Sequence, residues 1–170
     1  MFLSTQQQVV LNLSARFTQS HSQTTQYCNM SFPTTNSSLT LELLKTRSRA
    51  IMEVLCNQRD PNFTVARTLL HPALQMEHDD YPTTSDLEAY LTMFSEVLTS
   101  VPDFGCVVHT EIAELASNEE RQNGIGGRCW VFSTITGLQD GVEKYSVDMM
   151  VFDNQGLAIK LKDVQREIGK

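Results

Sequence analysis

The chain has 170 residues, 41% of them hydrophobic, which is typical of a single soluble globular domain with its own core. Its formal net charge of −7 and its lack of clustered Lys and Arg argue against nucleic-acid binding, which needs basic contacts to phosphate. No apolar run approaches the roughly 20 residues of a membrane-spanning helix, so we expect no membrane segment. We expect a cytoplasmic protein.

Residues 1–38 differ in composition from the rest of the chain. They are rich in Ser, Thr and Gln, and Arg16 is their only Lys, Arg, Asp or Glu. Such a segment buries too little apolar surface to offset its ordering entropy, which predicts a disordered extension. Its lack of acids is a feature of organelle-targeting peptides, although one Arg is few for that role, and Met30 is an alternative start. We therefore predict an extension over 1–38 and a folded domain over 39–170.

Two helices are predicted at the start of this domain. Thr40 can cap a helix over 41–58, in which apolar residues recur with helical spacing and Arg47 falls on the solvent side. A short helix over 63–70 follows and ends before Pro72, because proline disfavours helix in the residue that precedes it.

A strand and a third helix come next. Residues 73–78 alternate between polar and apolar like a strand, so that His78 faces one way and Glu77 the other. Ser85 opens the third helix with Glu88 three residues on, which is the spacing of a capping box.

The second half of the domain changes from helical to strand-like patterning. Polar or glycine-containing links join four runs rich in β-branched and aromatic residues, and short links of this kind favour antiparallel hairpins. The order of elements predicts an α+β fold with its helices on one side of a curved sheet. The four predicted strands are 106–115, 128–138, 143–153 and 157–165.

Three motifs lie on these predicted elements: LLHPALQMEHDDYP, VVHTEI and VDMMVFDNQGLAIKL. They resemble the nuclear transport factor 2-like superfamily, which includes ketosteroid isomerases, scytalone dehydratases and SnoaL-like polyketide cyclases. In the first motif a strand ends in acids, where ketosteroid isomerase-like proteins carry a general base. In the second, a His follows the third helix, as in scytalone dehydratase-like proteins. The third contains the D-x-x-x-F-x-x-x-G pattern often found in this superfamily.

The resemblance implies a cone-shaped α+β barrel with three N-terminal helices packed on a curved, mostly antiparallel sheet. It also implies a cofactor-free isomerase, cyclase or dehydratase that moves protons on a polyketide-, terpenoid- or steroid-like carbonyl compound of secondary metabolism. Two departures stand out. The first helix reads SRAIMEV where ketosteroid isomerases place a Tyr, and RCWVFST lacks the second His of scytalone dehydratases. We therefore expect neither of these two activities in its exact known form.

Three residues are candidates for catalysis. By the resemblance, Glu77 is a general base, and the alternative is a solvated strand end. His109 lies inside a strand, where a lone His is also common as a core or surface residue. Asp148 lies in the most apolar strand, where a buried carboxylate must be paired, hydrogen-bonded or protonated. The structural alternative for Asp148 is an ion pair with Arg128 or Lys144.

The predicted ligand is an apolar or polycyclic small molecule. We expect no metal, because His78 and Asp80 could share an ion but no second cluster supplies further ligands. We expect no cofactor, because no nucleotide-binding glycine pattern opens a helix. The candidate binding residues, which could equally be core, are His78, Tyr81, Phe94, Trp130, Phe132 and Met150.

Two non-catalytic functions remain alternatives. The same fold can hold a ligand without chemistry, since fold does not determine function. It can also serve as a dimerisation domain, and we expect a homodimer formed through the sheet. Four widely spaced cysteines without a CxxC pair predict free thiols in a reducing cytosol, the alternative being disulfides in a secreted chain.

Overall fold

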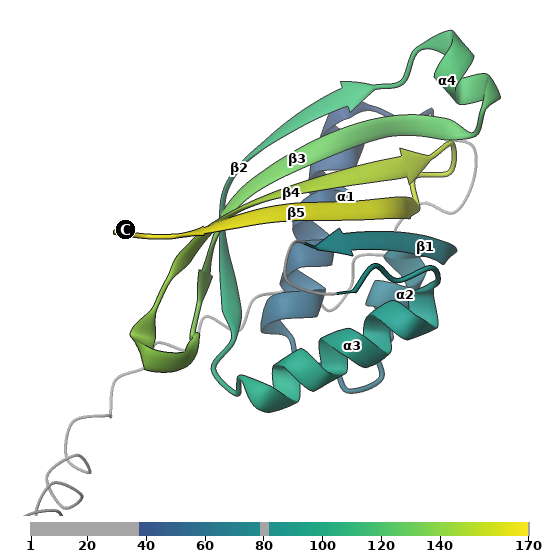
Figure 1. The fold of residues 1–170 in the computed structure, drawn as a ribbon. Helices are drawn as coiled ribbons and strands as arrows, with labels where there is room; N and C mark the ends of the chain where they lie inside the picture. The colour runs from purple at the N-terminus through teal and green to yellow at the C-terminus, as the bar shows by residue number, and fades with distance from the viewer. Residues whose placement is uncertain (1–37, 79–81, 170) are drawn as a thin grey trace, which may run out of the picture. The chain divides into compact units, whose positions relative to one another are not determined.

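The computed structural model describes residues 38–78 and 82–169, so the predicted extension lies, except for Ser38, outside the described residues. None of the helices in this part is long and apolar enough to cross a membrane. Figure 1 shows the elements, which are α1 (Leu41–Met52), a π-helical turn (Glu53–Asn57), α2 (Ala66–Leu69), β1 (Leu70–His78), α3 (Leu87–Ser100), β2 (Gly105–Leu115), α4 (Asn118–Gln122), β3 (Ile125–Thr136), a 3-10 turn (Gln139–Gly141), β4 (Lys144–Asp153) and β5 (Ala158–Glu167).

The five strands form one sheet in the order β1-β5-β4-β3-β2. Strands β2 to β5 are sequential antiparallel neighbours, as the short polar links predict. Strand β1 pairs with β5 in parallel, so the first and last strands of the domain lie side by side. The expected α+β class and the mostly antiparallel sheet are confirmed.

Helices α1, α2 and α3 cover one face of this sheet, which we call the inner face (Figure 1). Alternation along each strand sends apolar side chains to that face, where they meet the apolar stripes of α1 and α3. The thiols of Cys56, Cys106 and Cys129 are free and buried. Fully buried side chains of the core include Leu44, Ile51, Leu69, Leu74, Val131 and Phe152.

Helix α1 begins where it was predicted to begin, but the predicted exposure of one of its side chains is wrong. The Thr40 hydroxyl accepts a hydrogen bond from the Leu43 backbone N–H at 3.1 Å. Arg47 was expected in solvent, yet it is buried, and its Nη1 donates to the carbonyl oxygen of Gly156 at 2.6 Å. The charge of Asp153 also favours the guanidinium there. Arg47 therefore ties α1 to the turn between β4 and β5.

The predicted start of α3 is one residue too early. Asp86, not Ser85, is the N-cap, and its Oδ1 accepts from the Ala89 backbone N–H at 2.8 Å. Glu88 does not complete a capping box, because its carboxylate forms an ion pair with Arg67. An Asp at the N-cap satisfies the same free N–H group and adds a negative charge at the positive end of the helix.

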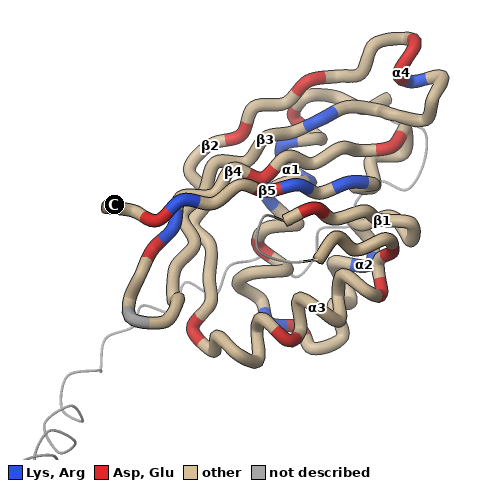
Figure 2. The backbone as a smooth tube through the Cα atoms, viewed as in Figure 1, with Lys and Arg blue, Asp and Glu red and all other residues tan. Residues whose placement is uncertain are grey.

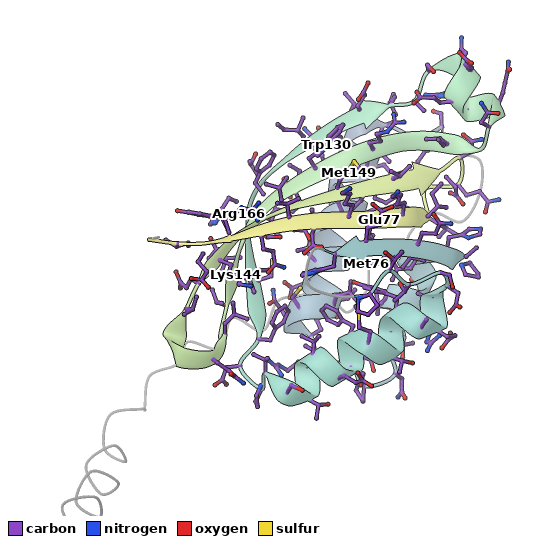
Figure 3. The ribbon with its side chains drawn as sticks, in the orientation of Figure 1. Met76, Glu77, Trp130, Lys144, Met149 and Arg166 are labelled. Carbon is purple, nitrogen blue, oxygen red and sulfur yellow. The ribbon has the colours of Figure 1, made fainter. Side chains whose placement is uncertain are left out.

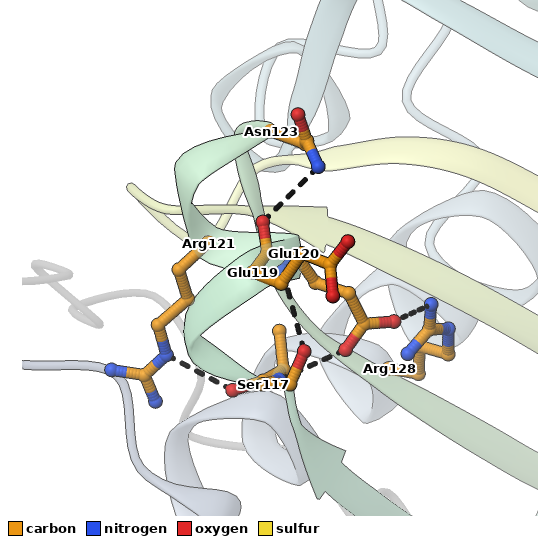
Figure 4. A network of polar contacts seen from close by, with 7 residues as sticks. Ser117, Glu119, Glu120, Arg121, Asn123 and Arg128 are labelled. Carbon is orange, nitrogen blue, oxygen red and sulfur yellow. Dashed lines mark hydrogen bonds and ion pairs between the residues drawn. The ribbon is translucent and has the colours of Figure 1, made fainter.

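The link between β2 and β3 contains α4, which the sequence interpretation treated as irregular. Ser117 and Glu120 form a capping box, in which each side chain accepts from the other residue's backbone N–H (Figure 4). The other carboxylate oxygen of Glu120 accepts from Arg128 Nη2 on β3 at 2.5 Å. This network anchors the helical turn to the sheet. The S-x-x-E spacing was visible in the sequence as a helix signal.

Candidate functional site

A small cavity lies between the helices and the inner face of the sheet. Its volume is about 30 Å³, which is room for about two water molecules. Residues of α1, the π-helical turn, α3, β1, β4 and β5 line it, so every layer of the fold contributes to its wall. The lining includes Met52, Met76, Met150, Tyr90, Asp148 and Asp163.

Two carboxyl groups and an imidazole lie in a row across three neighbouring strands beside this cavity. His78 on β1 is the register partner of Asp163 on β5, and Asp163 is the register partner of Asp148 on β4. Directly opposed residues on neighbouring strands point to the same face of a sheet. His78 Nε2 lies 3.1 Å from Asp163 Oδ2, and both side chains are more than nine-tenths buried.

Asp148 titrates far from the usual range of a carboxyl group. Burial, followed by the negative charge of Asp163, raises the pKa of Asp148 to about 7. The Ser146 hydroxyl, which donates to Asp148 Oδ2 at 2.9 Å, and the charge of His78 partly oppose this rise. Asp148 therefore exchanges a proton near neutral pH, as a general acid or base must.

Tyr90 of α3 brings a phenol to the same cavity. It is buried, and burial, with smaller effects from Cys56, Asp148 and Asp163, raises its pKa well above the usual value. The phenol is therefore a neutral hydrogen-bond donor at neutral pH.

Glu77, a candidate base, lies on the other face of β1, because it alternates with the inward-facing Met76 and His78. Figure 3 shows Glu77 on the outer face, and Figure 2 shows an acidic position of β1 beside basic positions of β5. Its two carboxylate oxygens contact Lys160 Nζ at 2.5 Å and Lys162 Nζ at 3.2 Å. Hydrogen bonds from these lysines lower the pKa of Glu77. Glu77 therefore forms surface ion pairs with these two lysines.

His109 also lies outside the cavity. Its ring is exposed, and Nε2 makes a 2.7 Å hydrogen bond with the Thr134 hydroxyl. The register between β2 and β3 shifts between Val108 and Thr110, so a bulge at His109 interrupts the alternation of side chains. The structure thus does not bring Glu77, His109 and Asp148 together.

The candidate binding residues separate into several locations. Met150 lines the cavity, and His78 adjoins it through Asp163. Trp130 and Phe132 alternate with buried neighbours and point to the outer face, as Figure 3 shows for Trp130.

Phe94 belongs to an aromatic cluster instead. Its ring centroid lies 5.9 Å from those of Tyr90 and Phe104 and 6.5 Å from that of Phe63. Tyr81 lies outside the described residues.

The sequence analysis did not identify two residues of the site, Tyr90 and Asp163. In LKDVQ, Asp163 stands two positions after the apolar Leu161, so both side chains point inward. An acid at an inward position of a predicted strand was the available signal. Among residues 38–78 and 82–169, no group of three or more His, Cys, Asp and Glu side chains could hold a metal ion.

Two fungal proteins are similar to this chain in sequence. It is 33% identical over 126 residues to the probable cyclase otaY of Aspergillus niger, a match that spans 74% of this chain and 93% of the relative. Its counterpart in Aspergillus carbonarius is 32% identical over 126 residues, spanning 74% and 90% of the two chains. No family model matches the sequence.

Solved structures share the fold at much lower identity. A putative ketosteroid isomerase from Kribbella flavida aligns with a TM-score of 0.57 and 18% identity, over 76% of this chain and 82% of that one. A SnoaL-like protein of unknown function from Burkholderia thailandensis gives 0.56 and 12%, over 76% and 99%. The Anabaena orange carotenoid protein binding canthaxanthin gives 0.55 and 12%, over 78% and 38%.

Proposed function

Because the chain belongs to the SnoaL-like family of the nuclear transport factor 2-like superfamily, we propose that it is a cofactor-free isomerase, cyclase or dehydratase. Asp148 is the acid–base residue, and the substrate is a polyketide-, terpenoid- or steroid-like carbonyl compound. The observation that carries the proposal is a carboxyl group in the cavity wall whose pKa of about 7 suits proton transfer at neutral pH.

The chemistry follows from the two protonation states of Asp148. As carboxylate it removes a proton from the carbon next to the substrate carbonyl, and as carboxylic acid it returns a proton to another atom. Tyr90, which stays protonated, is a donor in the same cavity wall. An apolar, enclosed site strengthens hydrogen bonds to the enolate oxygen, because no bulk water competes for it.

The ligand must enlarge the cavity. Small-molecule sites commonly measure roughly 300 Å³ or more, and this cavity holds about 30 Å³. Met52, Met76 and Met150 form much of its wall, and methionine side chains repack readily because they are unbranched and flexible. An apolar ring system that displaces these side chains would place its carbonyl at Asp148.

Proton exchange on a simple ketone tests the proposal without the natural substrate. In D2O at pD 7, we expect the wild-type protein to accelerate deuterium incorporation next to the carbonyl of 2-decalone, measured by NMR. Asp148→Asn should lower this rate about 100-fold or more, with the fold checked by circular dichroism. Exchange that Asp148→Asn leaves intact would refute the role of Asp148.

The same assay decides the roles that the sequence assigned to Glu77 and His109. Because both residues lie outside the cavity, Glu77→Gln and His109→Ala should exchange at close to the wild-type rate. A large loss in either variant would mean that substrate reaches the outer face of the sheet.

A second candidate function is homodimerisation through the outer face of the sheet, which α1, α2 and α3 leave uncovered (Figure 1). Large apolar side chains on this face are unusually exposed, at 57% for Ile112 and Tyr145 and 53% for Val107. A contiguous exposed apolar patch marks an interaction site. If Asp148 proves inactive, the same cavity and sheet describe a ligand-binding or dimerisation module.

A further inference from the structure

Among the described residues, only one of the two carboxylate oxygens of Asp163 has hydrogen-bond partners. His78 Nε2 lies 3.1 Å from Oδ2, and the Gln165 side-chain amide donates to the same oxygen at 2.9 Å. The other oxygen, Oδ1, is buried and has no hydrogen-bond partner among the described residues. Asp163 as a whole is only 5% exposed, and it lines the cavity.

A buried carboxylate oxygen without a donor is costly. Such an oxygen loses its hydrogen bonds to water and gains none in return, and native proteins rarely retain such groups without a reason. The strand register contributes to this arrangement, because Asp163 is held opposite Asp148 on one side and His78 on the other. The open oxygen is therefore a place for a donor that comes with a ligand.

We propose that Asp163 selects substrates that carry a hydroxyl group two carbons from the reacting carbonyl. While Asp148 is protonated, its carboxyl group donates to the substrate carbonyl oxygen and the substrate hydroxyl donates to Asp163 Oδ1. Directly opposed residues in an antiparallel pair have Cβ atoms about 4.5–5.5 Å apart, a spacing that fits the two oxygens of a β-hydroxy carbonyl compound. This inference rests on the proposed function and narrows it to one substrate class.

A matched pair of small probes tests the selection by binding alone. 3-Hydroxycyclohexanone carries the hydroxyl, and 3-methylcyclohexanone has a methyl group of similar size in its place. At pH 6, where Asp148 is protonated, we expect the hydroxy compound to bind about tenfold or more tightly, as a hydrogen bond to a charged group implies. The dissociation constants are measured from NMR shifts of backbone amides of β4 and β5.

Two variants assign the preference to Asp163. In the double variant His78→Phe/Asp163→Leu, apolar groups replace both partners, a change that proteins tolerate better than removal of one. It should bind the methyl probe as well as wild type does but lose the preference for the hydroxyl. Asp163→Asn, which keeps the shape but removes the charge, should reduce the preference. Glu119→Gln on the exposed α4 is the control and should retain it.

Two results would overturn the inference. Equal affinity of the wild type for the two probes, or no binding of either, would mean that Oδ1 does not receive a ligand donor. A preference that survives in the double variant would place the hydroxyl elsewhere. The 2-decalone assay measures proton exchange at Asp148 separately. Equal affinity with exchange intact overturns this inference alone, whereas loss of exchange overturns the proposed function.

Discussion

Asp148 and Asp163 are directly opposed on the neighbouring strands β4 and β5, which places two carboxyl groups side by side against one cavity. Like charges in this arrangement repel each other. The structure resolves the conflict unequally, because Asp163 has His78 and Gln165 as donors and Asp148 has the Ser146 hydroxyl. Burial, and after it the negative charge of Asp163, raises the pKa of Asp148 to about 7.

This raised pKa predicts a pH-dependent stability. Between about pH 4, the ordinary value for Asp, and pH 7, the folded protein holds a proton on Asp148 that the unfolded chain has lost. The stability that this bound proton contributes is therefore fully present below pH 4 and is lost as the pH rises to 7. Relative to that of wild type, the free energy of unfolding of Asp148→Asn should rise by roughly 2–4 kcal/mol between pH 4 and pH 8. Urea unfolding at several pH values measures this, and a constant difference would contradict it.

Glu120 should show the opposite dependence. Hydrogen bonds from Arg128 and Ser117 lower its pKa to about 2, so its stabilisation is present above about pH 4.5 and is lost as the pH falls to 2. Glu120→Gln should lower the melting temperature at pH 7, with a smaller effect near pH 2. Its neighbour Glu119→Gln is the control. Equal effects of the two changes at pH 7 would show that the network in Figure 4 is not stabilising.

Two glycines with left-handed backbone should respond differently to alanine. Gly137 has φ +73°, and a Cβ there would lie 1.7 Å from the Asp103 carbonyl oxygen. Gly141 has φ +69° but no atom within 4 Å of a Cβ. Both substitutions strain the backbone by about 1 kcal/mol. Gly141→Ala adds no steric clash, so it measures this strain alone. Gly137→Ala should cost several kcal/mol in denaturant unfolding, and similar costs for the two would mean that the chain near Asp103 relaxes.

A dimer formed through the outer face of the sheet should be disrupted by a single charged substitution on that face. If the sheet pairs with a second copy, Ile112→Asp places a carboxylate in the apolar interface, and the dimer should dissociate at micromolar concentration. Val65→Asp is a matched control, because Val65 is 41% exposed at the start of α2, away from the sheet. Sedimentation velocity measures both. A wild-type monomer, or an Ile112→Asp dimer, would exclude this interface.

Much of the fold could be predicted from local patterns. Strands β2 to β5 follow from alternation and short polar links, and Thr40 marks the start of α1. The errors arise where two local signals compete. Ser85 and Asp86 are both good caps, and only the folded chain shows that Asp86 accepts the bond. Arg47 was assigned to solvent by helix periodicity, which does not show that a glycine carbonyl more than 100 residues away would accept its proton.

The site was less predictable, because its geometry depends on strand register. Asp148 was identifiable as an acid in an apolar strand, but its pairing with Asp163 joins two strands by a register that the sequence does not specify. The pairing of Asp163 with His78 joins residues from the two ends of the domain. The position of His109 depends on register too, because the pairing of β2 with β3 shifts at this residue and its ring contacts the Thr134 hydroxyl.

A carbon-13 NMR titration measures whether Asp148 holds its proton near neutral pH. The carboxyl resonance, assigned by its absence from Asp148→Asn, is followed between pH 3 and pH 9. A midpoint near 7 is the predicted result, because the carboxyl is buried against Asp163. A midpoint near 4, the value of a solvated carboxyl, would contradict the account and leave the cavity without an acid–base group suited to neutral pH.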